Sequence, residues 1–381
     1  MTGDRPAIWR DRRSGVTGDL ALLAERRAGL AALLGLLVLE EPGPGLADYV
    51  AEHPAIAALA SAGTASATEY ERIFLRGVPL YESVFRSDDG QHGGDVLAEV
   101  VERYALVRFD EHAERRWRIA GPDHLGMELR CYATLCHDEA VAWRDEVPDV
   151  AVAAVETERT FLADHLSVWA QCAIEATVRV AGRSAYVAVL EAIDAFLGEE
   201  HERLRPRPRL GAGAVAAAVG LPGNVGPARL ARLLLAPATC GAWLDGSDIA
   251  AAARAIGAPW RASDTRSGLR QLIEAADGGG ELATLLAPLR EAVQRAGARH
   301  AARAGDEPGN EVTWRSWQAQ AVAMAALLDE IVERNRLAAP ASEGSERLTV
   351  FGADPSALAD EIDAVVATLR VNGWRVERDE R

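Results

Sequence analysis

The chain has 381 residues, of which 49% are hydrophobic and only 6% aromatic, and its 41 basic and 57 acidic residues give a net charge of -16. This acidity argues against a nucleic-acid partner, because a polyanion is repelled by net negative charge, and it suits a cationic partner. All the basic residues are arginine, so sites that need a lysine amine, such as P-loops and Schiff-base sites, are excluded.

The apolar residues recur mostly at helical spacing, which predicts an all-α protein of more than one domain. We expect a helical bundle over residues 1–205, a Pro/Gly-rich linker over 206–227 and a second helical unit over 228–337. A short strand, helix and strand are expected over 346–379, where they would form a small βαβ tail.

The first apolar segment runs from Ala28 to Leu39 and follows Arg26 and Arg27, so it imitates a secretory signal. Acidic residues precede it and its leucines share one helical stripe, so we expect a buried first helix instead. No segment reaches the roughly 20 apolar residues of a membrane span, which predicts a soluble protein without membrane insertion. The four cysteines form no C-x-x-C pair and are expected to be reduced thiols of a cytoplasmic protein.

Two sequence motifs lie in the first half of the predicted bundle. The motif YERIFL begins at Tyr70 and places three large residues, Phe74 among them, on one helical face, which core packing alone would explain. The motif GVPLYESV begins at Gly77 and forms an irregular loop that puts Tyr81 beside Glu82. An aromatic and an acid together on a loop are less readily explained by core packing.

A third motif, GPDHLGMEL, begins at Gly121 and predicts the start of a helix. Pro122 suits the first helical turn, and Asp123 is favoured there by the helix dipole. This places the His124 ring near the mouth of a loop, with Glu128 one turn further along the same face.

The fourth motif, FLADHLSVW, begins at Phe161 and places His165 and Trp169 on the same helical stripe. In this order, the four motifs resemble the TorD/DmsD/NarJ family of redox-enzyme maturation chaperones. Members of that family are all-helical and bind the twin-arginine signal peptides of DMSO-reductase-type molybdoenzymes until the cofactor is inserted. The third motif departs from the family signature, because Gly121 stands where an acid is usual.

The resemblance implies a non-enzymatic chaperone whose partner is a molybdoenzyme catalytic subunit with its signal peptide. No metal or cofactor is assigned, and whether a guanine nucleotide or the molybdenum cofactor binds is left open. Such a peptide offers two guanidinium groups and an apolar helix, so its receptor needs carboxylates at the mouth of a hydrophobic groove. The residues expected to bind the peptide are Phe74, Leu80, Tyr81, Glu82, Asp123, His124 and Glu128. Whether the chain forms a homodimer is left open.

Two other classes of function stay open. A helical scaffold that bridges subunits through the second helical unit would need exposed aromatic residues there, whereas Trp314 and Trp317 at helical spacing suit a core. An enzyme that uses Asp123 and His124 would need a bound metal or a small polar pocket, although their spacing matches no common metal site. A G-x-G-x-x-A pattern begins at Gly211, but no strand is predicted before it.

Overall fold

A computed structural model describes residues 7–41, 65–110, 121–205, 225–260, 265–307 and 309–338. The described part is all-helical, as the apolar spacing predicts, apart from an isolated antiparallel bridge between Tyr81 and His124. The expected βαβ tail at 346–379 lies outside the described residues, as does most of the expected linker at 206–227. Residues 1–336 form one compact unit, and the predicted boundary within it stays a prediction.

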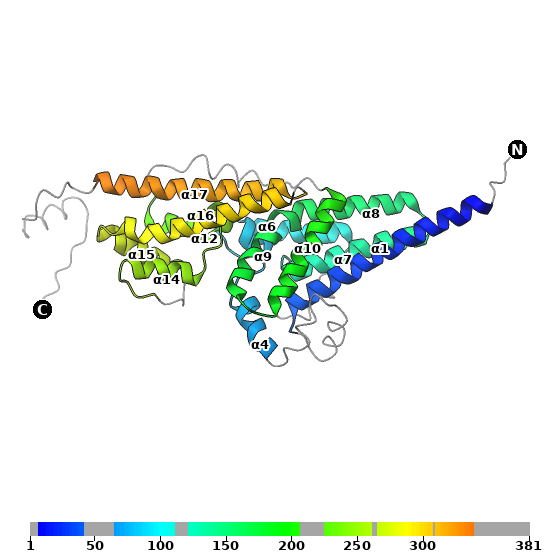
Figure 1. Ribbon diagram of the computed structural model, residues 1–381, viewed down its shortest axis with the longest axis horizontal. Helices are drawn as coiled ribbons and strands as arrows, with labels where there is room; N and C mark the ends of the chain where they lie inside the picture. The colour runs from blue at the N-terminus through cyan, green and yellow to red at the C-terminus, as the bar shows by residue number, and fades with distance from the viewer. Residues whose placement is uncertain are drawn as a thin grey trace, which may run out of the picture. The chain divides into compact units, whose positions relative to one another are not determined.

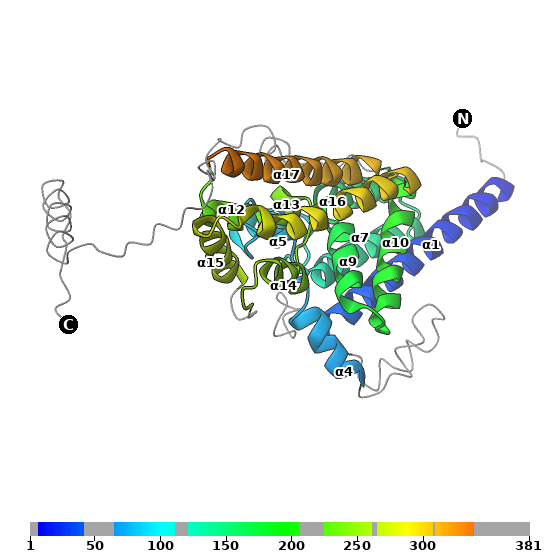
Figure 2. The same cartoon turned by 60° about the vertical axis from the view of Figure 1, so that its left-hand side comes forward.

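The N-terminal helices surround a shared hydrophobic core (Figure 1). They are α1 (Ala7–Leu39), α4 (Ala65–Tyr70), η1 (Glu71–Leu75), α5 (Glu82–Arg86), α6 (Gly94–Val107), α7 (Leu125–Arg144), α8 (Pro148–Phe161), η2 (Leu162–Leu166), α9 (Ser167–Ala181) and α10 (Tyr186–Leu204). The segments η1 and η2 are single π-helical turns. Helices α1 and α7 lie side by side in both views (Figures 1 and 2).

Helix α1 confirms the expected buried first helix, because Leu33, Leu34 and Leu37 are all buried in the core. A close approach of α1 to α7 explains a glycine on each helix. A methyl group on Gly126 would lie 2.7 Å from the carbonyl oxygen of Gly35, so the two backbones meet at this point. Among the described residues, no helix is long and apolar enough to cross a membrane.

The C-terminal helices surround a second hydrophobic cluster. They are α12 (Pro227–Leu235), α13 (Pro237–Cys240), α14 (Gly246–Ala255), α15 (Thr265–Gly278), α16 (Leu282–Asp306) and α17 (Glu311–Ala338). Trp314 and Trp317 of α17 are buried and belong to the N-terminal core, and Trp317 Nε1 donates to the Val168 carbonyl at 3.1 Å. They therefore offer no exposed aromatic surface of the kind that the scaffold alternative requires.

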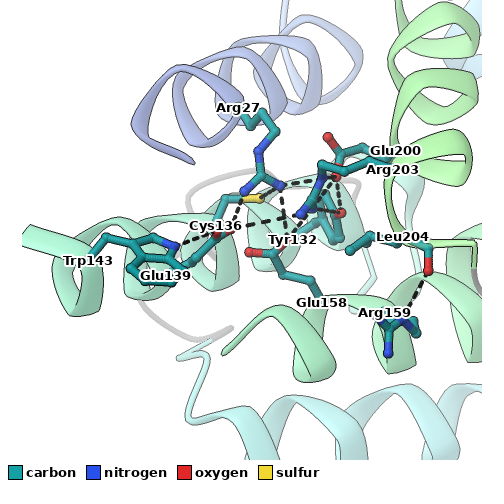
Figure 3. Close-up of polar contacts among 10 residues, drawn as sticks. All are labelled: Arg27, Tyr132, Cys136, Glu139, Trp143, Glu158, Arg159, Glu200, Arg203 and Leu204. Atoms are coloured by element: carbon teal, nitrogen blue, oxygen red, sulfur yellow. Dashed lines mark hydrogen bonds and ion pairs between the residues drawn. The ribbon is translucent and has the colours of Figure 1, made fainter. Parts of the chain in front are cut away.

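A buried ionic cluster joins α1, α7, α8 and α10 (Figure 3). Arg27 donates to Glu158 at 2.9 Å and to Glu200 at 3.2 Å, and it also contacts Glu139. Arg203 contacts the same three carboxylates. Burial raises the pKa of Glu158 to about 7 against the opposing charges of Arg27 and Arg203. The cluster holds three carboxylates but only two arginines. A proton on Glu158 would therefore balance the charges of the cluster.

Candidate functional site

The second and third motifs meet through their backbones. The Glu82 N–H donates to the Asp123 carbonyl at 2.8 Å, and the Leu125 N–H donates to the Leu80 carbonyl at 2.9 Å. These bonds flank the isolated bridge, which pairs one residue of the GVPLYESV loop, Tyr81, with His124. The start of α7 therefore fixes a loop that lies about forty positions earlier in the chain.

Asp123 organises this loop from inside the protein. Its Oδ2 accepts from the backbone N–H of Ser83 at 3.1 Å and from the Ser83 hydroxyl, while its Oδ1 lies 3.2 Å from His92 Nε2. The Asp123 side chain is fully buried. The expectation that it lies at the mouth of a groove is therefore wrong, because backbone and side-chain donors of the loop surround it.

His124 is the N-cap of α7, which begins at Leu125 and not in the expected turn around Pro122. The reason is that the His124 backbone is extended and pairs with Tyr81, so the helix starts only after it. The ring is buried, not at a loop mouth, and its Nδ1 accepts from the Gly126 N–H at 3.1 Å. Burial lowers the pKa of His124 to about 3, so the ring stays neutral and keeps its acceptor.

Tyr81 is the accessible member of the expected peptide-binding set. It is half-buried, whereas the side chains of the other six residues are buried. Its ring centroid lies 4.4 Å from that of His92 and 5.1 Å from that of His124. His92 is half-exposed and was not foreseen, because it lies in a loop without apolar periodicity after the Asp89 turn.

The fourth motif contacts the second and third motifs through two buried acids, Glu82 and Glu128. His165 Nδ1 lies 3.0 Å from Glu82, which also contacts Arg86. Burial alone would raise the pKa of Glu82, but the His165 hydrogen bond and the Arg86 charge hold it below its usual value. Trp169 Nε1 donates to Glu128 at 3.2 Å, while burial and the charge of Glu82 hold the pKa of Glu128 well above its usual value.

We call this assembly the motif junction, and its members are Tyr81, Glu82, Asp123, His124, Glu128, His165 and Trp169. Phe74 does not belong to it. Its ring packs 5.1 Å from Tyr70 and 5.2 Å from Tyr186, in an aromatic group of the core. Asp123, His124 and Glu128 have separate partners, and the described residues contain no group of three or more side chains arranged to hold a metal.

A cavity of about 350 Å³ lies beside the motif junction, between α5, α6 and η2. It is lined by Arg86, Glu99, Glu102, Arg103, Leu106, Asp164 and His165. Two ion pairs cross its walls, Arg86 to Glu99 at 3.0 Å and Arg103 to Asp164 at 2.8 Å. The spacing of the four α6 residues places them on one helical face, but the sequence does not reveal that η2 lies opposite.

The geometry is that of an all-helical domain with a polar centre, and comparison with known proteins identifies its class. Residues 39–175 match the family model described as nitrate reductase delta subunit. This part of the chain is similar to the NarJ/TorD-type chaperone family, and all four motifs lie within the matched residues. The family is known for redox-enzyme maturation chaperones that are not catalytic. No curated protein and no solved structure matches the chain.

Proposed function

We propose that this protein is a binding chaperone for a DMSO-reductase-type molybdoenzyme. It would hold the twin-arginine signal peptide of the catalytic subunit in the cytoplasm while the cofactor is inserted and before export. The family match over residues 39–175 carries this proposal. The net charge of -16 supports it, because an acidic surface speeds the encounter with a basic peptide.

The motif junction gives the proposal a location. Tyr81 is its accessible residue, so we assign it direct contact with the peptide, next to the exposed edge of His92. The buried Glu82, Asp123 and His124 act through the loop that they hold in place. Of the expected peptide-binding set, the core residue Phe74 has the least support, because it packs elsewhere.

Calorimetric titration tests the proposal. We expect saturable binding, at micromolar concentrations, of the signal peptide from a molybdoenzyme encoded beside this protein. The Asp123→Ala variant should bind more weakly, because the loop loses two hydrogen bonds at Ser83. Asp138→Ala is the matched control, since Asp138 is exposed on the same α7 helix. Absence of heat with the unmodified protein would refute the function.

A further inference from the structure

We propose that the cavity between α5, α6 and η2 is a subsite for a guanidinium group, with Glu102 and His165 as its acceptors. This inference rests on the proposed function and deepens it, since it assigns one arginine of the bound peptide to this cavity. It also places the accessible carboxylate, Glu102, outside the motif junction, whose own carboxylates are buried.

The unbalanced charge of the cavity is negative. Arg86 contacts Glu82 and Glu99, and Arg103 contacts Asp164, so both arginines of the lining are already neutralised. Glu102 is exposed and has no ion pair or hydrogen bond to another described residue. A cation therefore gains a partner here, whereas an anion would have to separate existing pairs.

The imidazole of His165 supplies a second acceptor from the interior. The side chain is 3% exposed, and its Nδ1 faces the ionised Glu82 carboxylate at 3.0 Å. With Nδ1 as the hydrogen donor of that contact, Nε2 is the ring nitrogen left to accept a hydrogen bond. Within the described residues Nε2 has no hydrogen-bond partner, although the ring lines the cavity. An unpaired acceptor nitrogen on a buried side chain that lines open volume suits a ligand that donates a hydrogen bond.

These two acceptors favour a guanidinium over an ammonium ion. A guanidinium group has several N–H donors in one plane and no acceptor, so it can bind a carboxylate and a neutral nitrogen together. Leu106 lies one helical turn after Glu102 on the cavity lining and is 68% exposed. An arginine held at the cavity would place a following apolar residue against Leu106, which fits a peptide whose arginines precede an apolar segment.

A cross-titration tests the assignment with full-length protein. The probe is a synthetic peptide of two adjacent arginines followed by an apolar segment, and the matched peptide has glutamine at both arginine positions. We expect Glu102→Gln to weaken binding of the arginine peptide about tenfold, as for a lost charged hydrogen bond. The glutamine peptide should bind the unmodified protein and the Glu102→Gln variant equally. Glu102→Gln then weakens binding only when the peptide carries arginine, which is the coupling expected of a direct contact. Glu191→Gln, an exposed change on α10, should have no effect.

The outcomes separate this inference from the function on which it rests. If unmodified protein binds the arginine peptide and Glu102→Gln binds it equally well, the cavity assignment is overturned while the chaperone function stands. If unmodified protein binds neither peptide, both fall. Displacement of the peptide by inorganic phosphate would assign the cavity to an anion through Arg86 and Arg103 and would also overturn the inference. Circular dichroism of each variant confirms that it is folded.

Discussion

The neutral ring of His124 holds the first turn of α7, and this is a prediction about one residue. His124→Ala should lower the free energy of unfolding by about 1 kcal/mol, because the Gly126 N–H loses its acceptor. His124→Asn should retain most of the stability, since asparagine is a good N-cap. Urea denaturation gives both values. His137→Ala, at an exposed position of the same helix, is the control and should change little.

The raised pKa of Glu158, about 7, makes stability depend on pH. Between the ordinary glutamate pKa and about 7, the folded protein binds a proton that the unfolded chain has released, so this contribution to stability falls as pH rises through that window. Glu158→Gln cannot titrate. Its stability relative to the unmodified protein should therefore increase between about pH 5 and about pH 8. A constant difference, measured by urea denaturation at both pH values, would contradict this.

Glu156→Gln provides the comparison for the pH experiment. Glu156 lies on the same helix α8 but is 60% exposed and pairs only with the neighbouring turn through Arg159. Its substitution should leave the pH profile close to that of the unmodified protein, because an exposed pair of this kind contributes little.

The contact between α1 and α7 depends on the absence of a side chain, which is a prediction at the scale of elements. Gly126→Ala should destabilise the protein by about 1–3 kcal/mol, because the new methyl group would press on the Gly35 carbonyl. Gly29→Ala, on α1 with open space around the added carbon, should instead stabilise by about 0.5–1 kcal/mol. Thermal unfolding of both variants gives the signs. If both stabilised, the close approach would be refuted.

At the scale of the whole molecule, Trp317 joins the C-terminal helices to the N-terminal core. The side chain of Trp317 is 4% exposed and bonds to the Val168 carbonyl. Since residues 1–336 form one compact unit, we expect tryptophan fluorescence and circular dichroism to report one shared unfolding transition. Trp317→Ala should lower the stability of that transition by about 3 kcal/mol or more. Two separate transitions in the unmodified protein would show instead that the helical units unfold independently.

The sequence by itself determined the class of the fold and indicated the family that residues 39–175 match. Helical spacing of apolar residues reports which face of a segment is buried, and this sufficed for the all-α fold, for the first helix and for Trp314 and Trp317. The four motifs pointed to the matched family because their order and spacing can be read directly from the sequence. Net charge favours a cationic partner, and that stays a prediction.

Only the tertiary structure decided where the charged residues lie. Periodicity says that a residue is buried but not against what, and the Glu82 to His165 contact joins positions 83 residues apart. The resemblance placed Glu82, Asp123 and Glu128 at the mouth of a groove because a cationic peptide needs accessible carboxylates, whereas the folded chain buries all three side chains. The cavity, too, results from tertiary packing and not from a local sequence pattern. It exists only because η2 packs opposite one face of α6, a pairing that no local pattern encodes.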